Sequence, residues 1–179
     1  TAEVGDNNKI REDVTINRGT AANGKTCVGS GNLLMESVHV AHDAFVGNDC
    51  IIGNGTKLAG EIIIDDHAII SANVLMHQFC RVGGYTMVGG GTRFSQDIPP
   101  YTICAREPVA YCGLNLVGLR RRGFSNELIE NIHNAYRIIY QGGVPLNEAL
   151  QKVREEVPAS PEINYIIEFI ENSKRGFVH

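Results

Sequence analysis

An apolar residue recurs at every sixth position through the first half of the chain. The series keeps one phase, and its members are Val4, Ile10, Ile16, Ala22, Val28, Leu34, Val40, Val46, Ile52, Leu58, Ile64, Ile70, Met76, Val82, Val88 and Phe94. An α-helix places its apolar residues with a period of 3.6 and a half-buried strand with a period of 2. A sustained period of six fits neither and indicates a repeat of short strands and turns.

Each hexad is expected to supply one short strand and one turn, so that three hexads close a triangular coil. Coils would stack at the spacing of paired strands, ~4.8 Å, with the sixth residues pointing inward. The residue two before each of these is mostly small or β-branched, as in Ala44, Cys50 and Thr56, and fits a crowded corner. Glycine often follows the inward residue, and glycines or asparagines are expected to supply the turn conformations with φ > 0. The pattern predicts a left-handed parallel β-helix, an exception to the right-handed crossover rule.

The departures from the pattern predict the domain layout. Residues 17–27 are rich in Gly, Asn and Thr and are interpreted as a loosened coil or external loop. We expect the β-helix to occupy residues 1–100 and to stop at Pro99 and Pro100, because proline cannot donate to a ladder. A connecting segment covers 101–123. Helical spacing from 124 to 179 predicts a small C-terminal α-helical domain of three helices, with Ser125 and Ser160 as caps and the last helix ending near Gly176.

Composition narrows the choice of partners. The 179 residues are 43% hydrophobic with a net charge of −4, which favours neither nucleic acid nor an anionic membrane. No apolar run is long enough to be inserted in a bilayer. Five cysteines without a CxxC pair indicate free thiols in a reducing cytoplasm, with Cys50 and Cys80 on repeat positions that should be buried. The chain opens within the pattern, so we interpret it as lacking N-terminal coils.

The eighteen-residue length of a coil predicts that several polar residues stack on one face. His39 and His42 flank the inward Val40 and point outward. Eighteen residues, one coil, separate His42 from Gly60 and Gly60 from Gln78, which follows His77. A neutral imidazole accepts a proton near pH 7, and the adjacent Asp43 can orient it. The backbone N–H of Gly60 can bind an oxyanion, so the group predicts acyl transfer to a hydroxyl.

Other interpretations of these histidines remain open. His67 and His133 are expected to be solvated surface residues, and His77 can be a purely structural hydrogen-bond partner. γ-Type carbonic anhydrases hold zinc with histidines on such a prism. Here Lys57 and Gly60 would stack on His39 and His42, and neither supplies a metal ligand. A structural solenoid without catalysis leaves the grouping of His42, Asp43 and Gly60 unexplained.

Four segments together resemble the UDP-N-acetylglucosamine O-acyltransferase family: NLLMESVHVAHDAFVGN, LAGEIIIDDHAII, MHQFCRVGGYTMVGG and GLNLVGLRRRGFS. The resemblance runs from Val4 through the tail. It implies transfer of an (R)-3-hydroxyacyl group from acyl carrier protein to the glucosamine 3-hydroxyl of UDP-N-acetylglucosamine, the first step of lipid A biosynthesis. It implies a cytoplasmic homotrimer with sites between subunits, no metal, and no cofactor beyond the carrier's phosphopantetheine. The outward His39, Val38 and Ala41 also suggest a covered face.

The resemblance also implies roles for single residues. His42 matches the general base, Asp43 its partner and Gly60 the oxyanion amide. The remaining matches are the cleft-lining His39, His77 and Gln78, the end of the acyl groove at Gly90, and the nucleotide contacts Asn115 and Arg121 or Arg122. Glu61 and Val117 depart from the family pattern, at positions near the sugar and the uridine.

Two related activities remain as alternatives. The N-acyltransferase of the same pathway uses the same prism but has a different N-terminal uridine-binding domain, and the NLVGLRRRGF segment argues against it. A CoA-dependent sugar acetyltransferase would need no acyl groove. The basic residues Arg120, Arg121, Arg122, Lys174 and Arg175 either receive an acidic carrier protein or form plain solvated surface.

Overall fold

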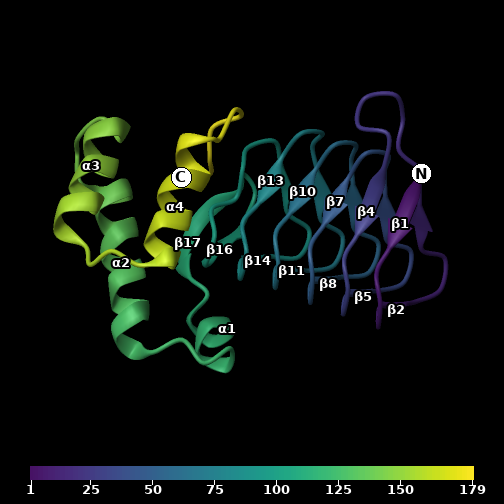
Figure 1. The fold of residues 1–179 in the computed structure, drawn as a ribbon, viewed down its shortest axis with the longest axis horizontal. Helices are drawn as coiled ribbons and strands as arrows, with labels where there is room; N and C mark the ends of the chain where they lie inside the picture. Colours follow the sequence, from purple (N-terminus) through teal and green to yellow (C-terminus); the bar gives the residue numbers. More distant parts are fainter.

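The computed structural model describes residues 1–179, which form a left-handed parallel β-solenoid followed by helices at one end (Figure 1). The first face of the prism has the strand order β1-β4-β7-β10-β13, and the third face has β15-β12-β9-β6-β3. The second face has the order β17-β16-β14-β11-β8-β5-β2. Up to β15 each face therefore takes every third strand, as a triangular solenoid requires, and β16 and β17 extend the second face.

The strands are short. The first face holds β1 (Ala2–Val4), β4 (Thr26–Val28), β7 (Phe45–Val46), β10 (Ile63–Ile64) and β13 (Arg81–Val82). The second holds β2 (Lys9–Ile10), β5 (Leu33–Leu34), β8 (Ile51–Ile52), β11 (Ile69–Ile70), β14 (Met87–Val88), β16 (Thr102–Ala105) and β17 (Ala110–Leu114). The third holds β3 (Thr15–Ile16), β6 (His39–Val40), β9 (Lys57–Leu58), β12 (Leu75–Met76) and β15 (Arg93–Phe94).

The predicted inward positions form the prism core. From Val28 to Phe94 each of them is buried, and the positions two before them, including Cys50 and Cys80, are buried as well. Val4 and Ile10 are inward in register but 46% exposed, because they lie in the first coil, whose open end no other coil covers. All five cysteines are free thiols.

The prediction that glycines or asparagines supply the turn conformations is confirmed only in part. The glycines that directly follow inward residues, such as Gly47 and Gly53, do not have positive φ; a Cβ there would lie 2.4–2.9 Å from the next coil. Positive φ falls three residues after the inward position, where glycines and asparagines such as Gly31, Gly55 and Asn73 adopt it as predicted, and where Asp43 and His67 adopt it as well. Glycine is therefore required for close approach between coils, and the left-handed turns accept several residue types.

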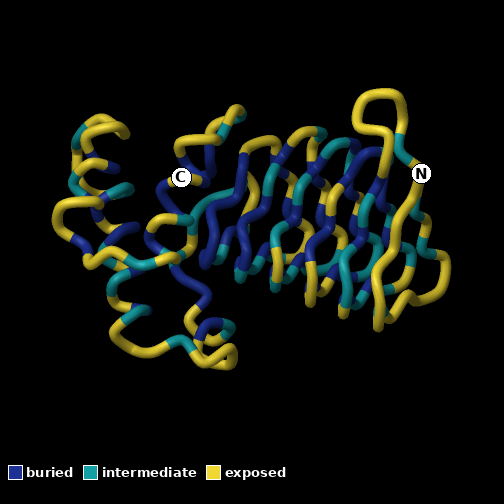
Figure 2. The backbone as a smooth tube through the Cα atoms, viewed as in Figure 1, coloured by how far each residue is buried: buried dark blue, intermediate teal, exposed yellow.

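The predicted loop at 17–27 is an insertion of one hexad. Val4 pairs with Val28, twenty-four residues later, whereas Val28 pairs with Val46, eighteen residues later. Residues 17–25, here called the external loop, project from the coil between β3 and β4 and are largely exposed (Figures 1 and 2). Ala22 keeps the hexad phase only because six residues were inserted, and it lies exposed in this loop rather than in the core.

The predicted end of the β-helix at residue 100 is too early. Ile98 bridges to Val82 and is fully buried, and β16 continues the second face in parallel beside β14, with Cys104 in the prism core. The prolines interrupt the ladder, but the chain re-enters it. The antiparallel β17 then pairs with β16, and both strands were missed.

The tail contains the predicted helices and one more. They are α1 (Leu116–Arg121), α2 (Asn126–Gln141), α3 (Leu146–Glu156) and α4 (Pro161–Glu171). Ser125 and Ser160 accept hydrogen bonds from Leu128 N–H and Ile163 N–H, as predicted for caps. The short α1 was missed, and α4 ends at Glu171 rather than near Gly176. After α4 the chain turns back to the prism, where Phe177 bridges to Asp97 and Val178 joins the core. None of the four helices combines the length and apolar character needed to cross a bilayer.

Candidate active site

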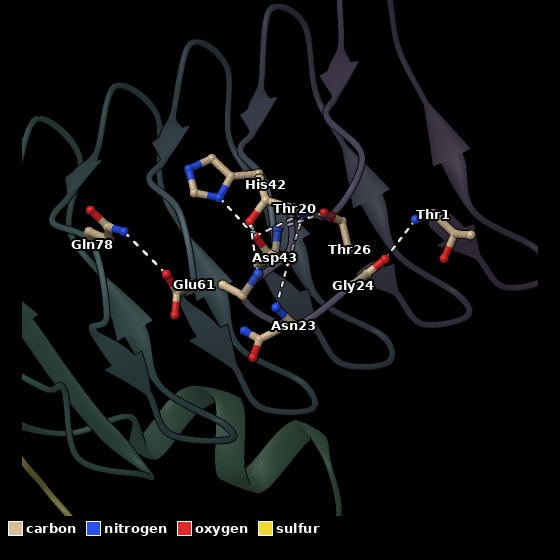
Figure 3. Close-up of polar contacts among 10 residues, drawn as sticks. Thr1, Thr20, Asn23, Gly24, Thr26, His42, Asp43, Glu61 and Gln78 are labelled. Carbon is tan, nitrogen blue, oxygen red and sulfur yellow. Dashed lines mark hydrogen bonds and ion pairs between the residues drawn. The ribbon is translucent and has the colours of Figure 1, made fainter.

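A histidine and an aspartate form a pair at the edge between the third and first faces. His42 and Asp43 follow β6, and the positive φ of Asp43 turns its carboxylate toward the preceding imidazole. The Nδ1 of His42 lies 2.9 Å from Asp43 Oδ2 (Figure 3). The imidazole is 40% exposed whereas the carboxylate is completely buried. With Nδ1 donating to the carboxylate, Nε2 is left as the nitrogen that can accept a proton.

The carboxylate of Asp43 is held by the external loop. The N–H of Thr20 donates to Oδ1 and Oδ2 over 3.0 and 3.1 Å, the Thr20 hydroxyl donates to Oδ2 over 2.5 Å, and the Asn23 N–H donates to Oδ1 over 3.3 Å (Figure 3). The Thr20 hydroxyl above all lowers the pKa of Asp43 to about 2, against the effect of burial. Asp43 is therefore an anion at neutral pH.

Sequence reasoning missed Thr20, Asn23 and Thr26. The buried Thr26 hydroxyl accepts the Asp43 N–H over 2.8 Å and so fixes the backbone of the pair. The eighteen-residue offset between coils cannot predict the loop contacts, because the residues of an inserted loop do not follow that offset. The only signal was the Gly, Asn and Thr content of residues 17–27.

Gly60 lies one coil from His42, as the arithmetic predicts. The Glu61 N–H donates to the His42 carbonyl over 3.0 Å, and the Phe79 N–H donates to the Gly60 carbonyl over 3.2 Å, so the corners of three coils are in register. A Cβ on Gly60 would lie 2.7 Å from Cε1 of the His42 imidazole. The Gly60 N–H donates to no group of the chain, and the residue is buried beneath the His42 imidazole.

The other predicted cleft residues follow the same edge. His39 pairs in register with Lys57, and its Nδ1 lies 2.7 Å from the Thr15 hydroxyl. His77 Nδ1 contacts the Gln78 carbonyl at 3.0 Å, and the Gln78 amide donates to Glu61 over 3.4 Å. The predicted grouping of His39, His42, Gly60, His77 and Gln78 is confirmed, while their roles stay predictions.

Two open hollows adjoin this edge. One, of about 540 Å³, separates His42 from the external loop and is lined by Asn17, Arg18, Gly19, Thr20, Ala21 and His42. The other, of about 1020 Å³, runs from Ala59, His77 and Gln78 toward Arg93 and Arg175. The first hollow is lined by His42 itself, and the second begins further along the edge, at Ala59, His77 and Gln78.

The remaining predicted site residues lie elsewhere in the single chain. Gly90 is at the edge between the second and third faces, where a Cβ would lie 3.4 Å from the Ala72 carbonyl. Asn115 is buried; it caps α1 by accepting the Gly118 N–H and donates to the Tyr85 carbonyl over 2.9 Å. Arg121 and Arg122 are exposed at the end of α1. The edge between the first and second faces, where Tyr85 lies, is not the edge of His42.

Two further expectations about surface residues are corrected. His67 is packed rather than solvated: its ring lies 4.7 Å from that of Tyr85, and Nδ1 is buried without a hydrogen-bond partner. His133 is exposed on α2, as expected. Val38 and Ala41 are buried in the chain itself, so they do not form an outward face. Three large exposed apolar side chains lie on the two faces that meet at this edge or at the edge itself: Phe45 in β7, Leu75 in β12, and Phe79.

Comparison with known proteins gives consistent similarities. Residues 97–178 match a family model described as UDP-N-acetylglucosamine O-acyltransferase, domain 2. A solved UDP-N-acetylglucosamine acyltransferase from Bacteroides fragilis is 72% identical, with a TM-score of 0.97 over 100% of this chain and 70% of that one. The enzyme from Francisella novicida is 38% identical (TM-score 0.95; 99% and 65% covered), and the enzyme from Arabidopsis is 33% identical (TM-score 0.94; 99% and 66% covered). The chain thus spans about two thirds of the length of these relatives.

Proposed function

The chain belongs to the UDP-N-acetylglucosamine O-acyltransferase family, which makes it an acyltransferase of lipid A synthesis, and from this premise we propose its reaction in detail. It transfers an (R)-3-hydroxyacyl chain from the phosphopantetheine of acyl carrier protein to the glucosamine 3-hydroxyl of UDP-N-acetylglucosamine. It works in the cytoplasm and needs no metal or other cofactor.

The observation that carries the proposal is the packing of the His42–Asp43 pair against Gly60. His42 Nε2 takes the proton of the acceptor 3-hydroxyl as the oxygen attacks the thioester carbonyl. The Gly60 N–H donates to the oxyanion of the tetrahedral intermediate. When the intermediate collapses, the C–S bond breaks and the thiolate leaves with the proton from His42. Asp43 stabilises the imidazolium between these two steps, since its low pKa keeps it charged.

A second copy of the chain completes the site in this proposal. Asn115, Arg121 and Arg122 lie at a different edge of the prism from His42, so nucleotide contacts from these residues must come from a neighbouring subunit. Exposed Phe45, Leu75 and Phe79 surround the His42 edge and offer an apolar surface for that neighbour. Both features support a homotrimer with the acceptor bound between subunits.

The acyl chain is proposed to run along the third face toward Gly90. His39, His77 and Gln78 line the start of this path. Glu36 belongs to the same coil as His42, and Gly90 stacks three coils beyond it. At ~4.8 Å per coil, the groove from His42 to Gly90 would be about 14 Å long. Glu61 accepts from Gln78, and Val117 is 60% exposed on α1. The atoms nearest Gly60 are those of the His42 ring, so neither departure from the family pattern takes part in that contact.

The deciding experiment incubates the purified chain with UDP-N-acetylglucosamine and a panel of acyl carrier protein thioesters. We expect a product heavier by one 3-hydroxyacyl group, with the ester at the glucosamine 3-oxygen by NMR. A product acylated on an amine, from an amino-sugar acceptor, would identify the N-acyltransferase instead. Turnover with acetyl-CoA but not with carrier-bound acyl chains would identify a sugar acetyltransferase.

A further inference from the structure

We propose that Thr20 of the external loop is a positioning residue, which acts through Asp43 to fix the orientation and proton arrangement of His42. This inference rests on the proposed role of His42 as the base. Thr20 lies in the inserted loop, outside the hexad lattice, and its hydroxyl donates to Oδ2 of Asp43. It is the one side chain besides His42 that donates to the Asp43 carboxylate.

The hydrogen bonds around Thr20 have a defined direction. The Ala22 N–H donates to the Thr20 hydroxyl oxygen over 3.3 Å, so the hydroxyl proton is directed toward the carboxylate. That hydroxyl donates to Oδ2 of Asp43, the same oxygen that accepts from Nδ1 of His42. A carboxylate can only accept, so the nitrogen facing Oδ2 must carry a proton. The contact therefore selects the tautomer with its lone pair on Nε2.

The loop itself is anchored, so that Thr20 has a fixed place. The Gly19 N–H donates to the Thr1 carbonyl over 2.8 Å, and the Thr20 and Asn23 N–H groups bind Asp43. A loop that holds a buried carboxylate by four donated hydrogen bonds acts as a support for the catalytic pair. The same loop forms the opposite wall of the hollow in front of His42. Support and ligand access are thus coupled in one segment.

Loss of the Thr20 hydroxyl should move the pH profile of the activity in a predictable direction. Without that donor, more negative charge remains on Oδ2, which strengthens its attraction for a protonated His42 ring. A general base works only when neutral, so the low-pH limb of the activity profile moves to higher pH. Arg18 lines the hollow in front of His42, Glu61 on the next coil bonds the His42 carbonyl through its N–H, and His39 lies in β6. A Thr20 variant leaves these three charged or titratable residues unchanged.

The test compares Thr20→Val, which keeps the shape, with Thr20→Ser, which keeps the hydroxyl. Lys25→Ala is the matched control, because Lys25 lies in the same loop but pairs only with the exposed Glu3. We expect Thr20→Val to lower kcat about tenfold or more through misplacement of the base and to shift the acid limb upward. Thr20→Ser should restore both quantities, and Lys25→Ala should change neither. NMR titration of the His42 ring in wild type and in Thr20→Val tests the same effect without any turnover.

Two results would overturn the inference. One is a Thr20→Val enzyme with wild-type kcat and an unmoved acid limb. The other is a loss of kcat with no change in the His42 titration and no rescue by serine, which means that the loop serves folding only. If His42→Ala itself keeps turnover, the proposed function fails, and the NMR titration still decides whether Thr20 controls the pair. Thr20→Ala provides a second variant if the valine disturbs the loop.

Discussion

The imidazole of His42 packs against the backbone of Gly60 in the neighbouring coil, so closely that a Cβ on Gly60 would come within 2.8 Å of Nε2. The proposed base and the proposed oxyanion donor are therefore fixed relative to each other by the coil stacking. Residue 60 has no room for a side chain unless the imidazole moves.

Gly60→Ala tests this contact. The added methyl group should push the imidazole away from the Gly60 N–H and lower kcat about a hundredfold, as expected for a misplaced catalytic group. Steady-state kinetics measures this, with the melting temperature as a control, because the ring is partly exposed and can move without disturbing the core. An alanine variant with wild-type kcat would contradict the assignment of Gly60.

His42→Ala should lower turnover by about 10²–10⁴-fold, the range that a positioned general base contributes. The fold and the assembly should remain, since the side chain is not part of the core. His133→Ala is the control, because His133 is an exposed histidine on α2. Turnover within about tenfold of wild type would remove His42 from the mechanism.

Asp43 should contribute a pH-dependent part of the stability. Its pKa falls from 3.8 to about 2 on folding, so its stabilising effect is fully present above pH about 4 and is lost as the pH falls through about 2. The difference in unfolding free energy between wild type and Asp43→Asn should therefore shrink over this interval. Urea unfolding at several pH values measures it, and a constant difference would mean that the folded pKa is not lowered.

Gly90→Met should shift the donor preference to a shorter 3-hydroxyacyl chain. Loss of four buried methylenes at ~0.8 kcal/mol each costs about 3 kcal/mol, roughly a hundredfold in selectivity. The backbone tolerates a side chain there, since φ is not positive and a Cβ would make only a moderately tight contact with Ala72. Competition among carrier-bound donors of mixed length, with Gly90→Ala as an intermediate, measures the effect. An unchanged length preference would place the end of the groove elsewhere.

Phe79→Asp should disrupt the proposed trimer. Phe79 is 49% exposed beside the His42 edge, and a buried unpaired carboxylate at a subunit contact is costly. Leu146→Asp provides the control, because Leu146 is an exposed apolar residue on α3 in the helical tail. Light scattering at micromolar concentration should give a trimer for wild type and the control and a smaller species for Phe79→Asp. A wild-type monomer would refute the trimer.

The hexad period by itself determined the solenoid, its inward residues from Val28 to Phe94, and the stacking of His42 on Gly60. These follow from the sequence because each coil contacts only its neighbours, so a fixed offset of eighteen residues predicts a contact. The helix caps Ser125 and Ser160 could also be predicted from the sequence, since a cap makes its hydrogen bond within the first helical turn. Local and strictly periodic contacts are the ones that a sequence reveals.

Only the tertiary structure decided what holds Asp43 and where the nucleotide-contact candidates lie. Thr20 reaches Asp43 from an inserted loop that has left the lattice, and β16 re-enters the ladder after Pro99 and Pro100 in a register that the period does not give. Asn115, Arg121 and Arg122 lie at another edge because α1 directly follows β17, where Asn115 donates to the Tyr85 and Tyr101 carbonyls. Such contacts depend on the path of irregular segments in space, which no repeat in the sequence encodes.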